Sequence, residues 1–267
     1  MNTVLIVWKY YDFVIRKSNK IVTANGIKFH YSLDGEVSKP VLVLVNMASI
    51  NLTAWEPVLT TLLTTYRILR FDIRGTGKSA WGKEDEFTFS QYADDLASIM
   101  DVLHIPKAFV LGVAYGARTA AQFALRHEEK LTALGLFDVT LTPPVEQSQQ
   151  KALAAQARQL LDGVGESEVE TKKSWRFYEN RDAAFKAHTA HQYEPDTSEM
   201  LGRLRVPVLV ACGRQDMNLN EAQRISNAIP NGRFELMEMT GHGSPFYRPE
   251  LFASIVNKFK SELILVF

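Results

Sequence analysis

A histidine and an aspartate in this chain stand where they could move a proton. His242 lies between two glycines after the last predicted strand, and Asp216 follows the strand before it. A carboxylate beside an imidazole holds its tautomer and stabilises its cation. Asp138 also ends an apolar run and is an alternative acid, but Gly213 eases a tight turn for Asp216. We expect Asp216 to pair with His242, and Asp138 to cap the connection that follows it by accepting backbone N–H groups.

A glycine-flanked turn is the third feature with chemical meaning. The apolar run 109–113 leads into Gly112-Val113-Ala114-Tyr115-Gly116, and a stretch rich in Ala and Leu follows. The pattern predicts a strand, a sharp turn and a helix, with glycines where side chains would collide. A serine at the centre of such a turn could attack a carbonyl carbon. Position 114 is alanine, which has no atom that can do so.

Alternating strands and helices must position these residues. Asn25-Gly26 predicts a hairpin between 21–23 and 27–33. Continuous apolar strands are predicted at 41–45, 68–71, 109–113, 134–137, 206–212 and 234–237, with helices at 55–64, 90–103, 220–229 and 249–263 and another from the turn to about 126. This alternation indicates an α/β fold with a mainly parallel, doubly wound sheet covered on both faces. Groups that follow such strands meet at one edge of the sheet, so one pocket could collect Asn46, Ala114, Asp138, Asp216 and His242.

The composition changes between the two halves of the predicted sheet. Residues 143–200 are rich in Gln, Ala, Glu and Lys and show helical periodicity without a convincing strand. We therefore divide the chain into an N-terminal extension (1–20), a core (21–142 and 201–267) and a helical cap insertion (143–200). A cap supplies apolar walls and excludes water. The candidates to line the pocket and bind substrate are Trp175, Phe177, Tyr178 and Phe185.

The overall composition excludes several classes of function. The chain has 267 residues and a formal net charge of zero, so we expect no nucleic-acid partner. Its first apolar cluster, at 4–8, is too short to span a membrane and resembles no signal peptide. The single cysteine, Cys212, excludes an intrachain disulfide and fits a reducing, cytoplasmic location. His188 and His191 are three apart, but no third ligand stands out, so we expect no metal and no cofactor.

Four segments together resemble the α/β-hydrolase superfamily from about residue 21 to the end, and most closely its small esterases and lactonases around 3-oxoadipate enol-lactonase. They are residues 46–55, 72–79, the turn at 112–116, and 213–216 with Gly241-His242. The order of nucleophile, acid and histidine is the order of that family. The resemblance implies an α/β-hydrolase fold with a small ester or lactone as substrate. It leaves the substrate and the oligomeric state open.

The resemblance also assigns roles position by position. Ala114 takes the place of the nucleophile, Asp216 that of the acid and His242 that of the base. The backbone N–H groups of Met47 and Tyr115 would form the oxyanion hole. Asn46 stands where many members have histidine and is a substrate-binding candidate, while Asp72, Arg74 and Ser79 match a motif that shapes the fold.

Three interpretations of Ala114 remain open. A serine hydrolase could carry alanine as an engineered, inactive form that still binds its ligand. A natural enzyme without serine could use His242 and Asp216 as a general base in lyase or cofactor-free chemistry. A non-catalytic member could bind a small ligand, although no chemistry would then require both residues. We favour the first interpretation, a serine hydrolase of esters or lactones. We expect the chain as written to have little activity in nucleophilic hydrolysis.

Overall fold

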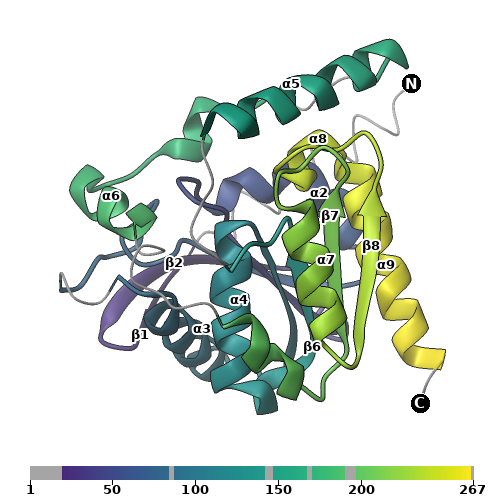
Figure 1. Cartoon of the computed structure of the whole chain (residues 1–267). Helices are drawn as coiled ribbons and strands as arrows, with labels where there is room; N and C mark the ends of the chain where they lie inside the picture. The colour runs from purple at the N-terminus through teal and green to yellow at the C-terminus, as the bar shows by residue number, and fades with distance from the viewer. Residues whose placement is uncertain (1–19, 84–86, 142–146, 167–169, 190–196, 266–267) are drawn as a thin grey trace, which may run out of the picture.

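A computed structural model of the chain describes residues 20–83, 87–141, 147–166, 170–189 and 197–265 (Figure 1). The N-terminal extension predicted over 1–20 therefore lies outside the described residues, apart from Lys20. Helices surround one sheet, as the alternating sequence pattern predicts. None of the helices in these ranges is long and apolar enough to cross a membrane.

The sheet has eight strands in the order β1-β2-β4-β3-β5-β6-β7-β8. Strands β3 to β8 pair in parallel, whereas β1 and β2 form an antiparallel hairpin at one edge. Asn25 and Gly26 both have positive φ, as the predicted Asn-Gly turn requires. The strands are β1 (Lys20–Ala24), β2 (Ile27–Asp34), β3 (Val41–Val45), β4 (Arg67–Phe71), β5 (Ala108–Val113), β6 (Leu131–Phe137), β7 (Val208–Gly213) and β8 (Gly232–Met237).

Helices cover both faces of this sheet. The core helices are α2 (Glu56–Leu62), α3 (Phe89–Val102), α4 (Tyr115–Arg126), α7 (Leu219–Ala228), α8 (Ser244–Tyr247) and α9 (Pro249–Leu265), with short 3₁₀ helices η1 (Leu52–Trp55) and η3 (Glu128–Lys130). The predicted boundaries agree with these to within a few residues.

Two apolar clusters, one on each face, hold the layers together. Tyr92 of α3, Ala120 of α4 and Ile225 of α7 belong to one cluster, and Leu59 of α2 and Phe252 of α9 belong to the other. Because β3, β5, β6 and β7 contribute to both clusters, they read as continuous apolar runs rather than as alternating ones. The predicted parallel sheet covered on both faces is confirmed.

The described residues between β6 and β7 form four helical elements. These are α5 (Gln147–Gly163), η4 (Lys173–Arg176), α6 (Arg181–Thr189) and η6 (Ser198–Arg203). Figure 1 shows α5 and α6 at the same end of the sheet as α8, which follows β8. Ala157 of α5 is buried against Gly241, and Ala187 of α6 accepts a hydrogen bond from Tyr92 of the core. The segment thus packs on the edge where the strands end.

Candidate functional site

The turn between β5 and α4 holds Ala114 in a strained backbone conformation. Its φ is 53° and its ψ is −112°, which lies outside the regions that a residue with a Cβ prefers. Such a conformation costs on the order of 1–3 kcal/mol and persists only where its surroundings impose it. The Ala114 N–H donates to the Phe137 carbonyl at 2.8 Å, and its own carbonyl accepts from Ala117 at 3.0 Å. The chain therefore keeps a strained turn around a methyl group that does no chemistry.

The two glycines of the turn allow α4 to approach the sheet. A Cβ on Gly112 would stand 2.1 Å from the Gly116 carbonyl oxygen, and one on Gly116 would stand 2.3 Å from the Val45 oxygen. Both distances are far below any contact that a side chain could tolerate. The predicted steric reason for these glycines is confirmed. Their close approach also brings the start of α4 next to the end of β3.

His242 is paired with Asp216 at the ends of β7 and β8. His242 Nδ1 lies 2.9 Å from Asp216 Oδ2, and Asp216 Oδ1 accepts from the Asn218 N–H, also at 2.9 Å. Gly213 makes this possible, because a Cβ there would stand 2.1 Å from the carbonyl oxygen of Thr240 in the neighbouring loop. The structure brings Asp216, and not Asp138, to the imidazole. Since Nδ1 is held by the carboxylate, Nε2 is the nitrogen left for proton transfer.

The environment of His242 raises its affinity for a proton. Burial alone lowers the pKa of the imidazole, but the charge and hydrogen bond of Asp216, with a further contribution from Asp138, raise it from 6.5 to about 9. The protonated ring is therefore stabilised by two carboxylates. A carboxylate next to an imidazole stabilises the protonated ring in this way.

Asp138 has a different role from the one that the sequence suggested. We expected its carboxylate to cap the connection after β6. Instead Asp138 Oδ2 accepts from the N–H groups of Gly243 and Ser244, at 3.1 and 2.8 Å, in the loop that carries His242. Glycine at 243 has φ 95°, so the loop turns sharply back toward that carboxylate. Asp138 therefore holds the backbone of the loop that carries His242 and does not bond to the imidazole ring.

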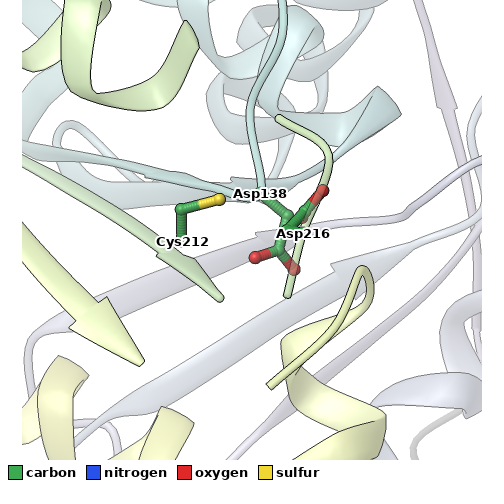
Figure 2. Close-up of side chains that lie close together, drawn as sticks. All are labelled: Asp138, Cys212 and Asp216. Atoms are coloured by element: carbon green, nitrogen blue, oxygen red, sulfur yellow. The ribbon is translucent and has the colours of Figure 1, made fainter. Parts of the chain in front are cut away.

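Asp138, Asp216 and Cys212 form a buried cluster (Figure 2). One ligand atom from each lies within 4.8 Å of the others. Burial and the charge of Asp216 raise the pKa of Asp138 to about 6, whereas His242 and Ser244 lower it. Burial, together with the charges of Asp216 and Asp138, also raises the pKa of the Cys212 thiol far above its ordinary value. Both carboxylates of the cluster stabilise the protonated ring of His242.

The two oxyanion-hole candidates lie at the ends of neighbouring elements. Tyr115 is the first residue of α4, and the N–H groups of a helix's first turn point out of its end. Met47 follows β3, whose end contacts Gly116. The Met47 side chain reaches the histidine loop, because its methyl carbon lies 3.4 Å from where a Cβ on Gly243 would be. Tyr115 therefore adjoins the strained turn at Ala114, and the Met47 side chain adjoins the loop that carries His242.

The Asn46 side chain does not lie where substrate binding would need it. It is fully buried, its Nδ2 donates to the Phe71 carbonyl at 3.0 Å, and its Oδ1 accepts from Trp55 Nε1 at 2.8 Å. These bonds tie the loop after β3 to η1 and β4. The expectation of a direct substrate contact from this side chain was wrong, because its polar atoms are used to hold the loop that carries Met47.

A cavity of about 420 Å³ opens beside the imidazole. His242, Met47 and Ile50 line it from the core, and Trp175 lines it from the inserted segment. The Trp175 ring is 3% exposed and stacks on Phe246 with ring centroids 5.3 Å apart. Of the four aromatic candidates in the insertion, Trp175 is therefore the one that shares a cavity with His242. Phe246 is not among the residues that the sequence pattern suggested, although its position four residues after His242 was a usable signal.

The other three aromatic candidates lie farther along the insertion. Tyr178 and Phe185 line a second cavity, of about 340 Å³, between α6 and the loop at Ser49. Phe177 is 49% exposed and lines neither of these two cavities. His188 of α6, considered above only as a metal-ligand candidate, stacks on Tyr115 with ring centroids 6.3 Å apart. His191 lies outside the described residues.

Replacing Asp138 with alanine tests its role in the histidine loop. The change leaves the buried N–H groups of Gly243 and Ser244 without their acceptor. We expect the free energy of unfolding, measured in urea, to fall by about 2–4 kcal/mol. Asp138→Asn keeps an acceptor oxygen and is the matched control, with an expected loss under about 1 kcal/mol. Equal stability of the two variants would show that these hydrogen bonds do not hold the loop.

The raised pKa of His242 predicts a pH dependence of stability. The folded chain holds this proton up to a pH of about 9, whereas the unfolded chain loses it near 6.5. The stabilisation is therefore complete below the unfolded value and is lost as the pH rises through the folded value. We expect the melting temperature to fall over that window and Asp216→Asn to flatten the fall. If the melting temperature fell with pH equally in the unchanged chain and in Asp216→Asn, the assigned ion pair would be contradicted.

Comparison with known proteins covers most of the chain. The model of the "Alpha/beta hydrolase family" matches residues 51–255. The relative named "Putative carbamate hydrolase RutD" of Caulobacter sp. (strain K31) is 27% identical over 235 residues, which are 78% of this chain and 86% of the relative. The 3-oxoadipate enol-lactonase 2 of Acinetobacter baylyi (strain ATCC 33305 / BD413 / ADP1) is 23% identical over 248 residues, 86% of this chain and 92% of that one.

A solved structure supports the same likeness. The enol-lactonase from Burkholderia xenovorans LB400 superposes with a TM-score of 0.75 at 24% identity, covering 91% of this chain and all of that one. The family match spans the inserted segment as well as the strands that carry Ala114, Asp216 and His242.

Proposed function

Because this chain belongs to the alpha/beta hydrolase family, we propose that its site is built for acyl transfer to water from a small ester or lactone, with Ala114 at the position of the nucleophile. The observation that carries the proposal is the strained backbone of Ala114 at the end of β5, together with an intact pair of His242 and Asp216 at the ends of β7 and β8. Related proteins are named for hydrolysis of a carbamate and of an enol-lactone. Both named substrates are attacked at an acyl carbon, which is the step this geometry serves.

With serine at position 114, the reaction would follow from the contacts described. Nε2 of His242 would take the hydroxyl proton as the oxygen attacks the acyl carbon, and the resulting imidazolium would be stabilised by Asp216. The N–H groups of Met47 and Tyr115 would bind the oxyanion. His242 would then return the proton to the leaving oxygen, and water would release the acyl group by the same steps.

With alanine at position 114, the first step has no attacking atom. The cavity, the base and the proposed oxyanion donors all remain, so the chain as written binds an acyl substrate without forming an acyl-enzyme. Replacing serine with alanine removes one oxygen and leaves the turn in place, so the rest of the site is retained. Whether the alanine is natural or introduced does not alter that chemistry.

The inserted segment acts as a cap in this proposal. Trp175 and Phe246 close one side of the cavity next to His242, and Ala157 of α5 covers Gly241. Apolar walls of this kind exclude water and strengthen the electrostatic interactions of the polar groups inside. In this proposal the core supplies the acid and the base, and the insertion supplies part of the cavity wall, including Trp175 and the basic side chains of Lys172, Lys173 and Arg176.

A second candidate function keeps the base and omits the nucleophile. The pair of His242 and Asp216 could take a proton from a substrate or from water, as in lyase or cofactor-free chemistry, and contribute roughly 10²–10⁴-fold. The retained pair is the observation in its favour. The discriminating experiment compares ester turnover by the unchanged chain, by His242→Ala and by Ala114→Ser. Turnover by the unchanged chain that His242→Ala abolishes would favour the second candidate.

A further inference from the structure

The loop after β3 is held by the inserted segment as well as by the core. The Asn51 N–H donates to the Trp175 carbonyl at 2.8 Å. Two residues earlier, the Ser49 carbonyl accepts from the Tyr178 hydroxyl, and Ser49 Oγ shares a 3.1 Å hydrogen bond with His188 Nδ1. In the proposed reaction this loop supplies one oxyanion donor, so the insertion holds the backbone on which that donor depends.

Ser49 has a strained backbone within this loop. Its φ is 57°, in the left-handed region that a residue with a Cβ rarely adopts. Such a conformation persists only where the surroundings impose it. The carbonyl and the hydroxyl of Ser49 are each bonded to the insertion, the first to Tyr178 and the second to His188. The path of the chain between Met47 and η1 therefore depends on these two side chains.

His188 also contacts the segment that carries the second proposed donor. Its ring stacks on the Tyr115 ring with centroids 6.3 Å apart and planes 14° from parallel, and Phe89 packs on the Tyr115 ring with centroids 4.6 Å apart. The Ala187 carbonyl accepts from the Tyr92 hydroxyl at 3.4 Å, which joins α6 to α3 next to this contact. One side chain of the insertion thus touches both segments that supply the proposed oxyanion donors.

We propose that His188 is a positioning residue for the oxyanion hole, which fixes the loop after β3 and the first residue of α4 relative to each other. The inference rests on the proposed function, in which the N–H groups of Met47 and Tyr115 bind the oxyanion. Two donors stabilise a developing charge only when both lie at hydrogen-bond distance from one oxygen. A misplacement of about 1 Å can cost roughly 100-fold in rate. The insertion thus contributes to the chemical step and not only to the cavity wall.

Kinetics in the Ala114→Ser chain test this role. We expect His188→Ala to lower kcat for p-nitrophenyl acetate by roughly 10–100-fold, while KM changes less than about 3-fold. His188→Asn can keep the hydrogen bond to Ser49, and His188→Phe can keep a ring on Tyr115, so each should retain part of the lost rate. Asp182→Ala, an exposed change in α6 that lines neither cavity, is the matched control and should leave kcat unchanged.

Phenylboronic acid gives a second readout of the oxyanion hole in the Ala114→Ser chain. The introduced serine oxygen adds to boron and its proton passes to His242, so the adduct carries the tetrahedral geometry and negative charge of the reaction intermediate. The inhibition constant should rise in His188→Ala by about the factor by which kcat falls. A higher KM with unchanged kcat would show that His188 binds substrate instead. That result, or an unchanged inhibition constant, would overturn the proposal.

Hydrogen exchange in the unchanged chain tests the positioning independently of turnover. We expect peptides that cover residues 47–51 to exchange roughly 3–10-fold faster in His188→Ala, because the strained loop loses a contact that imposes its conformation, and not in Asp182→Ala. Equal exchange would overturn the proposal. His188 is exposed, so circular dichroism should show that its variants keep the fold. Failure of the proposed function is seen separately: the Ala114→Ser chain with His188 intact would then show no turnover, although exchange in the unchanged chain still depends on His188.

Discussion

Ala114→Ser is expected to raise the hydrolysis of p-nitrophenyl acetate by roughly 10⁴–10⁶-fold over the unchanged chain. The turn already holds residue 114 at φ 53° and ψ −112°, and His242 is already paired with Asp216 at 2.9 Å. The substitution adds one hydroxyl to a residue that is 8% exposed, so the backbone need not move. Steady-state release of p-nitrophenol measures the gain.

The control for this experiment is the double variant Ala114→Ser with His242→Ala. It carries the new hydroxyl but has no base, so its rate should return to near that of the unchanged chain. A folded Ala114→Ser chain that binds the ester but shows no turnover would contradict the hydrolase interpretation. Equal rates for the single and double variants would show that the gain does not come from the assigned site.

Asp216→Asn, introduced into the Ala114→Ser chain, is expected to lower the restored rate by about 10³–10⁴-fold. The carboxylate holds Nδ1 of His242, and its charge raises the pKa of the ring. An amide can donate to that nitrogen, which favours the wrong tautomer, and it leaves the imidazolium without its nearest counter-charge. The rate constant kcat should carry most of the loss, because Asp216 does not contact the substrate cavity.

Asp138→Asn in the same background is the matched control, since it also removes one buried carboxylate from the cluster in Figure 2. Its amide oxygen can still accept from Gly243 and Ser244, so the loop of the base should stay in place. We expect at most a few-fold change in kcat near neutral pH. If Asp138→Asn were the more damaging of the two, the assignment of the acid would be reversed.

The parts of this molecule that the sequence predicted depend on local patterns. Apolar runs predicted the buried parallel strands. The glycines on either side of Ala114 predicted a tight turn, which a Cβ at Gly112 or Gly116 would prevent. The pairing of Asp216 with His242 follows from the order of the strands that precede them, because neighbouring parallel strands end at the same edge. These are features that a one-dimensional pattern can carry.

The features that the sequence did not predict depend on distant partners. Asp138 bonds to backbone groups about 105 positions away, and nothing near it in the chain marks them. Asn46 sits at the expected loop, but whether its amide faces the pocket or the core was decided by Trp55 and Phe71. In the insertion, Trp175 faces inward while Phe177 is exposed, because the segment there is a short 3₁₀ turn without the periodicity of a long helix.

The central claim is that position 114 lies in a working acyl-transfer site from which only the nucleophilic oxygen is missing. Intact-mass spectrometry after brief mixing of the Ala114→Ser chain with p-nitrophenyl acetate tests it most directly. The account predicts one added acetyl group, located at residue 114 by peptide mapping, and none at that residue in the unchanged chain. A folded serine variant that binds the ester yet stays unacetylated at residue 114 would contradict it.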